Sequence, residues 1–125
     1  MMNRPALLLI AALSLLVTSA CGPNTREEWR DDITRTTCER YEDCGRIGSG
    51  DDKFYNSFDD CIVKQRDAYN DLWPSDRCSD ESIDEKKAEE CIDRAKVRSC
   101  STSTIERGFE DAGFFSQCSA SKVCE

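Results

Sequence analysis

Hydrophobic residues recur at helical spacing in four stretches of this chain, and a Ser or Thr followed three residues later by an acid stands at the start of each stretch. The four signals are Thr25/Glu28, Ser57/Asp60, Ser82/Glu85 and Ser103/Glu106. Such a hydroxyl accepts a hydrogen bond from a backbone N–H of the first helical turn, while the acid reaches back to the cap residue. The pattern therefore predicts four helices, one after each signal.

Apolar stripes predict the inner faces of these helices. The expected inner residues are Trp29, Ile33, Thr37 and Tyr41; then Phe58, Cys61, Ile62, Gln65, Ala68, Tyr69 and Leu72; then Ala88, Cys91, Ile92 and Ala95; and finally Ile105, Phe109 and Ala112. Gly45, Pro74 and Gly113 are stop signals for the first, second and fourth helices. Alternating runs of β-branched residues are absent, so strand signals are weak. We expect an all-α fold, a small disulfide-rich bundle of about four helices.

Residues 1–20 have the pattern of a signal peptide. Arg4 supplies a positive charge, residues 6–17 form an apolar segment, and residues 18–20 are small enough for a signal peptidase. A helix as long as the apolar segment rises only about 18 Å, too little for a hydrocarbon core of about 30 Å. We therefore expect the mature chain to be exported, with any membrane attachment made covalently.

The stretch VTSAC at residues 17–21, followed by Gly22, resembles the lipobox of bacterial lipoproteins, in which the cysteine is acylated and becomes the new N-terminus. Thr18 stands where such boxes usually have Leu. The resemblance implies a lipid anchor on Cys21, stable with two or more acyl chains. It also implies sorting to the outer membrane, because Gly22 rather than Asp follows the cysteine. The alternative is ordinary cleavage after Ala20, which leaves Cys21 as a plain thiol on a secreted protein.

The number of cysteines favours the anchored alternative. There are nine, and an odd count in an exported protein leaves one thiol without a partner. If Cys21 carries lipid, an even set remains that predicts four disulfides: Cys38, Cys44, Cys61, Cys78, Cys91, Cys100, Cys118 and Cys124. The connectivity stays open, except that an antiparallel pairing of the first two helices should bring Cys61 against Cys38 or Cys44.

The charge and length of the chain limit its partners and its domain organisation. Without residues 1–20 the chain has 25 acids against 16 bases, a formal charge of −9. An acidic surface argues against nucleic acid and against anionic head groups. It mostly means a solvated, soluble surface; the alternative is that it repels neighbours or attracts basic partners or divalent cations. We expect a signal peptide over 1–20, a lipid-anchor linker over 21–27 and a single cysteine-rich helical domain over 28–125.

Catalytic motifs are absent from the sequence. There is no histidine, which removes imidazole bases and His-containing metal sites, and there is no C-x-x-C or P-loop. The carboxylate pairs at 51–52 and 59–60 do not match the spacing of a calcium-binding loop. We therefore assign no catalytic residue, no metal site and no cofactor. A carboxylate-dependent enzyme stays open, because it needs only two acids suitably separated in space.

Three aromatic residues lie at predicted helix boundaries: Trp73, Phe114 and Phe115. Large aromatics at such positions can anchor a binding partner. The alternative is that they close the ends of the bundle.

The cysteine spacing over residues 38–124, with the Trp-Pro turn at 73–74, resembles small cysteine-rich bacterial lipoproteins of unknown function, some labelled as associated with natural-product biosynthesis. That resemblance implies no catalytic residues. We expect an envelope-anchored, disulfide-stabilised lipoprotein that acts as a binding or interaction module for an unknown envelope protein or small molecule. The alternatives are a small envelope accessory enzyme using carboxylates and a helical inhibitor of a secreted enzyme.

Overall fold

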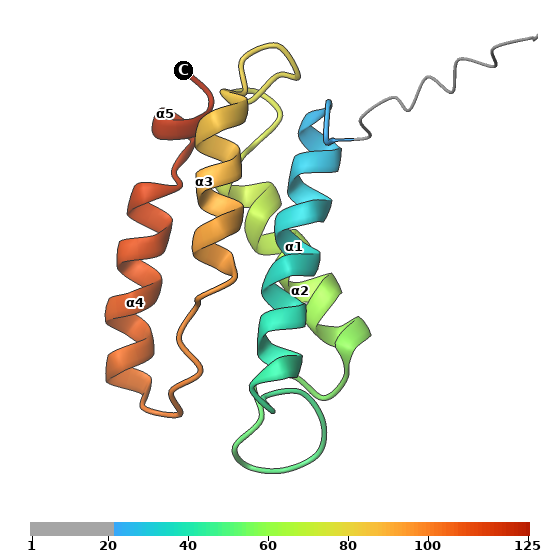
Figure 1. Ribbon diagram of the computed structural model, residues 1–125, viewed down its shortest axis with the longest axis vertical. Helices are drawn as coiled ribbons and strands as arrows, with labels where there is room; N and C mark the ends of the chain where they lie inside the picture. Colours follow the sequence, from blue (N-terminus) through green and yellow to red (C-terminus); the bar gives the residue numbers. More distant parts are fainter. Residues whose placement is uncertain (1–21) are drawn as a thin grey trace, which may run out of the picture.

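The computed structural model of this protein describes residues 22–125, so the predicted signal peptide and the predicted lipid site at Cys21 lie outside the described residues. The helices are α1 (Arg26–Asp43), α2 (Phe58–Leu72), α3 (Glu85–Ala95), α4 (Thr104–Gln117) and a short α5 (Ala120–Val123). The first four alternate in direction along the bundle (Figure 1). Strand-like pairing within the described residues is limited to an isolated bridge between Ile47 and Tyr55. The predicted all-α fold is confirmed.

Helix starts follow the predicted capping pattern at three of four places. Thr25, Ser57 and Ser103 are the N-caps of α1, α2 and α4, and each hydroxyl accepts a hydrogen bond from a backbone N–H of the first turn. The prediction is wrong for α3, which Asp84 caps instead of Ser82. Ser82 bonds the backbone of Ser79 in the preceding turn, so its hydroxyl is already engaged.

Two of the three predicted stop signals end their helices, and the third does not. α1 stops before Gly45, whose φ of 73° is the left-handed conformation that favours glycine, and α2 stops just ahead of Pro74. The predicted stop at Gly113 is wrong, because α4 continues to Gln117. Gly113 keeps a helical backbone there, and the extra turn carries Phe114 into the core.

Four disulfides tie the helices to one another. Cys38–Cys61 joins α1 to α2, Cys91–Cys118 joins α3 to the end of α4, and the two ends of the bundle are closed by Cys44–Cys100 and Cys78–Cys124. Cys61 thus takes one of its two expected partners. Each such crosslink contributes about 2–4 kcal/mol through its constraint on the unfolded chain. Disulfides in this number indicate an oxidising, extracytoplasmic environment.

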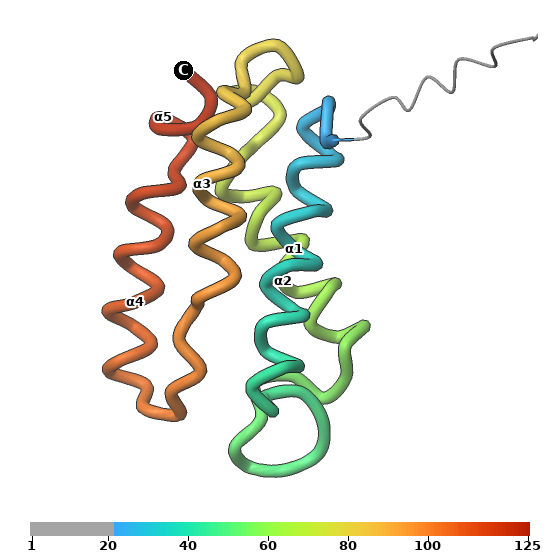
Figure 2. The backbone as a smooth tube through the Cα atoms, in the orientation of Figure 1, coloured from blue at the N-terminus to red at the C-terminus, as the bar shows by residue number. Residues whose placement is uncertain are grey.

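The core is divided into two apolar clusters. The larger one packs α1, α2, α3 and the C-terminal segment around Trp29, Ile33, Tyr69 and Trp73. The smaller one lies where α1 meets the loop over residues 45–57. Figure 2 shows this loop at the foot of the bundle. Buried polar residues accompany them: Thr34, Thr37, Gln65 and Arg98. A small core divided in this way makes the disulfides important for stability.

The folded domain includes the first residues of α1. Arg26, within the range expected as linker, donates from its backbone N–H to Asp80 and from its side chain to Asn70. Its guanidinium also donates to the carbonyl oxygen of Trp73. The first helix therefore begins four residues after Gly22, close in the sequence to the predicted attachment point at Cys21. Over the described residues, every helix is too short or too polar to cross a membrane.

Candidate functional site

Two of the three aromatics predicted to contact a partner lie in the core instead. Trp73 is fully buried, and its Nε1 donates to the carbonyl oxygen of Cys118 at 2.8 Å. Phe114 is buried edge-on against Tyr69, while the half-buried Phe115 ring lies 5.4 Å from that of Phe114. The partner-contact prediction is therefore corrected for Trp73 and Phe114. Their rings fill the space between α2 and α4, which is the alternative role of closing the bundle.

Arg98, a buried cation in the connection between α3 and α4, holds α4 against the bundle. Its side chain is only 2% exposed. Its Nε donates to Glu110 Oε1 at 2.9 Å, its Nη2 is paired with Asp111, and its guanidinium carbon lies 4.1 Å from the centre of the Phe114 ring. The guanidinium carbon also lies 5.3 Å from the centre of the Phe115 ring, so Arg98 binds α4 through two carboxylates and two aromatic rings.

The environment of Arg98 changes the protonation of its neighbours. Burial raises the pKa of the Glu110 carboxyl, although the charge of Arg98 opposes the shift. Burial also raises the pKa of the Tyr69 hydroxyl, which lies 2.8 Å from Thr37 Oγ1 and accepts a longer hydrogen bond from Arg98. Glu110 and Asp111 both bind Arg98, so both carboxyl groups have a structural role. We call Arg98, Glu110, Asp111 and Phe114 the Arg98 clamp, and burial favours the protonated form of its Glu110 carboxyl.

The clamp fixes which side of α4 faces the bundle. Arg107 also points inward, with its guanidinium carbon 3.7 Å from the centre of the Phe54 ring. Residues 107, 110, 111 and 114 therefore form the inner side, since each residue advances about 100° around a helix. Ile105 and Phe109 lie on the opposite side and are 73% and 79% exposed.

This orientation overturns the prediction that Ile105, Phe109 and Ala112 form the inner stripe of the fourth helix. The stripe is genuine, but it points to solvent. The physical reason is that α4 is docked by the Arg98 clamp and by Cys118, both on the other side. The sequence does not show this choice, because Arg98 lies just before α4 and only its burial against distant residues such as Tyr69 decides the orientation.

The outward side of α4 is the candidate functional site, and we call it the outer face. It consists of Ile105, Gly108, Phe109, Ala112, Gly113 and Ser116. All six are uncharged, in a chain in which 34% of the residues are charged. Phe109 and Ile105 are four residues apart and so adjacent on the helix surface. Apolar residues scattered singly over a protein surface are common, whereas adjacent large apolar side chains on an uncharged helix face can mark an interaction site.

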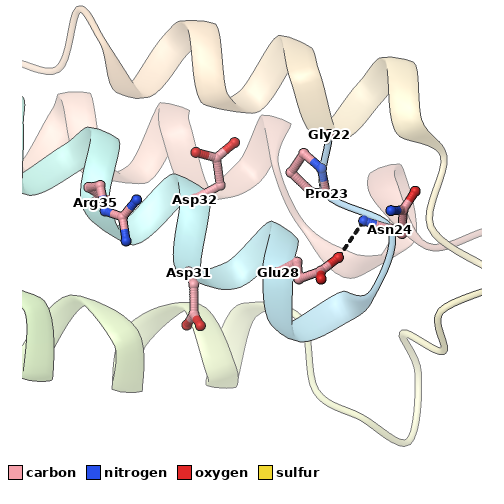
Figure 3. Close-up of a pocket in the computed structure, with 7 residues that line it drawn as sticks. All are labelled: Gly22, Pro23, Asn24, Glu28, Asp31, Asp32 and Arg35. Carbon is pink, nitrogen blue, oxygen red and sulfur yellow. Dashed lines mark hydrogen bonds between the residues drawn. The ribbon is translucent and has the colours of Figure 1, made fainter. Parts of the chain in front are cut away.

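A second surface feature lies at the start of α1. A hollow of about 460 Å³ is lined by Gly22, Pro23, Asn24, Glu28, Asp31, Asp32 and Arg35. Figure 3 shows Asp31 and Asp32 pointing to different sides of α1, so they do not converge on one ligand. Glu28 accepts from the backbone of Asn24 at 2.7 Å, and Asp31 pairs with Arg30 and Arg66. The carboxylates of Glu28 and Asp31 therefore have structural roles.

The remaining acids offer no metal centre within the part of the chain that the structure describes, where no three potential ligands are grouped to hold an ion. Of the acid pairs considered from the sequence, Asp52 lies against Arg46 and Lys53, and Asp60 is paired with Lys64. Lys64 donates a hydrogen bond to Asp60, and this interaction lowers the pKa of that carboxyl.

Comparison with known proteins places the chain in a family. No curated protein and no solved structure matches it. One family model matches residues 38–125, a range that starts at the first disulfide cysteine and contains all four disulfides. Because this match covers more than half of the chain, the protein belongs to the family of unknown function DUF6184.

Proposed function

We propose that this protein is an envelope-anchored lipoprotein that binds a protein partner through the outer face of α4. The observation that carries the proposal is the exposure of Phe109 and Ile105 side by side on a helix that Arg98 and Cys118 bind from its other side. Rigid aromatic and aliphatic anchors contribute much of the binding energy in protein interfaces. Exposing the side chains of Phe109 and Ile105 to water costs free energy, and burying them against a partner would remove that cost.

The anchor is supported by the cysteine pairing and the N-terminal segment. All eight cysteines of the described residues pair with one another, which supports reserving Cys21 for lipid. The apolar segment over residues 6–17 and the lipobox-like stretch support export and acylation. Attachment to a membrane would raise the effective concentration of the module near an envelope partner without any new contact. Gly22 rather than Asp after the cysteine supports the outer membrane, by the sorting habit of the lipoproteins whose lipobox this stretch resembles.

The binding role is tested by reversible crosslinking in intact cells that produce the full chain. We expect the wild-type protein to be recovered in a crosslinked complex, and Phe109→Asp to abolish that complex, because a charge is then placed at the centre of the outer face. The matched control is Val63→Asp, which changes an apolar residue that is 57% exposed on α2. A complex that survives Phe109→Asp, or that both variants abolish, contradicts the proposal.

The anchor is tested separately by the intact mass of protein extracted from membranes, with and without reduction and thiol alkylation. We expect a lipid adduct on Cys21 and eight thiols that become alkylatable only after reduction. A mass without lipid, together with one thiol that reacts before reduction, would replace the anchored protein by a secreted one.

A further inference from the structure

We infer that the outer face of α4 receives an α-helix of a basic partner protein, packed closely against Gly108 and Ala112. This inference deepens the proposed function and rests on it. It is carried by three observations: a glycine inside α4 that nothing within the chain requires, the pattern of large and small residues around it, and the charge and position of the face.

The glycines are the first observation. Gly108 and Gly113 lie inside α4 and have no positive φ, so their conformation does not require glycine. A Cβ atom built at either position meets nothing within 4 Å outside the local helix, so close packing inside the protein does not require it either. Glycine is unfavourable relative to alanine in a helix interior. Gly108, on the outer face, leaves room there for the backbone of another chain, whereas Gly113 lies about 140° further around the helix, beyond Phe109.

The pattern of side-chain sizes is the second observation. Ile105 and Phe109 form a raised row four residues apart, and Gly108, Ala112 and Ser116 form a low row with the same spacing beside it. A ridge next to a groove along i±4 rows is the surface with which helices interdigitate. A partner helix can therefore place its own ridge in the groove and receive Phe109 in return. An extended peptide would not use the regular four-residue spacing of the two rows.

Charge and position are the third observation, and they distinguish among occupants. The formal net charge of −8 opposes a second copy of this chain and favours a partner whose apolar face is bordered by Lys or Arg. The same charge opposes anionic lipid head groups. In Figure 1, α4 begins at the end of the bundle opposite to the start of α1, so Ile105, the second residue of α4, lies away from the end where a membrane anchor would attach. A basic, helical protein segment is the occupant that fits.

The inference is tested by placing the photocrosslinking residue p-benzoylphenylalanine at position 109 of the full chain in producing cells, with position 63 on α2 as the control. We expect a crosslink from position 109 to a helical segment with an apolar face and neighbouring Lys or Arg residues, identified by mass spectrometry. A crosslink to a second copy, to lipid or to an acidic segment overturns the inference. Of these, a crosslink to another protein still leaves the binding role standing, whereas no crosslink to any protein removes both.

The glycines provide a test that separates binding from folding. We expect Gly108→Ala and Gly113→Ala to raise the melting temperature, by about 4–8 °C each, because alanine favours the helix. Gly108→Ala should also lower the crosslink yield from position 109 at least fivefold, because the added methyl group holds the partner helix away, whereas Gly113→Ala, outside the low row, should leave that yield unchanged. A yield that is unchanged or increased in Gly108→Ala overturns the close helix–helix contact.

Discussion

Arg98 shows how a single residue organises this small protein. It is a fully charged side chain placed where a core residue would otherwise lie, and it is bound by two acids and an aromatic ring of α4. Such a buried cation favours one arrangement of the helices more than it raises the overall stability. The free-energy cost of removing it from water offsets much of its attraction to the two acids. Its removal is costly all the same, since the acids that face it then lose their partner.

Arg98→Met is therefore expected to lower the free energy of unfolding by about 3 kcal/mol, the low end for breaking a buried pair. The low end applies because Glu110 and Asp111 are 28% and 39% exposed and can turn toward water. The control is Arg77→Met, which removes an exposed pair with Glu125 and should cost less than about 1 kcal/mol. Urea unfolding at pH 7 measures both, and equal effects would contradict a special role for Arg98.

The titration of Glu110 leads to a prediction of pH dependence. Burial raises the pKa of the Glu110 carboxyl above its ordinary value of 4.5. Between pH 4.5 and the raised pKa, the native protein therefore holds a proton that the unfolded chain has released. The stabilising contribution is present below pH 4.5 and is lost as the pH rises through the raised pKa. We expect Glu110→Gln to flatten this decrease of unfolding free energy, measured by urea unfolding from pH 4.5 upward.

Asp60 is the control with the opposite sign. Its pKa is lowered from the ordinary value of 3.8, so its contribution is present above pH 3.8 and disappears as the pH falls through the lowered value. Asp60→Asn should change only the acidic limb, below pH 3.8. If both variants changed the same part of the profile, the assignment of the higher titration to Glu110 would be wrong.

At the scale of elements, α4 is the helix whose two sides have different roles. Its inner side contributes Phe114 to the core, and its outer face exposes Phe109. Phe114→Ala should lower the free energy of unfolding by about 3–5 kcal/mol, because it opens a cavity between α2 and α4. Phe109→Ala should stay within about 0.5 kcal/mol of wild type, as expected for surface positions. Thermal unfolding of the two variants distinguishes the sides, and a large loss from Phe109→Ala would restore the inward orientation predicted from the sequence.

At the scale of the whole molecule, the four disulfides differ in how far a reductant can reach them. Cys44 and Cys100 are half-buried, whereas the other six disulfide cysteines are buried. Exchange requires a thiolate to reach the sulfur, so limited dithiothreitol under native conditions should open Cys44–Cys100 first. Alkylation followed by peptide mass mapping identifies the opened pair. Earlier alkylation of Cys38 or Cys61 would contradict this order.

Local signals in the sequence determined much of this architecture. Capping hydroxyls and an acid three residues on predicted three helix starts correctly, because these bonds involve only neighbouring residues. Gly45 and Pro74 predicted two helix ends for the same reason: a left-handed residue and a ring without an N–H act where they stand. The even set of cysteines predicted a disulfide framework without any knowledge of the fold.

Only the tertiary structure decided the connectivity of the disulfides and the orientation of α4. Pairing depends on which cysteines meet in space, and eight cysteines leave many possibilities. The orientation of α4 depends on Arg98, which precedes the helix and is bound from its inner side by Glu110 and Asp111. The apolar stripe of Ile105 and Phe109 was visible in the sequence as half of an amphipathic helix. That it faces outward follows from a long-range choice, since a buried guanidinium and a disulfide hold the opposite side of α4 against the bundle.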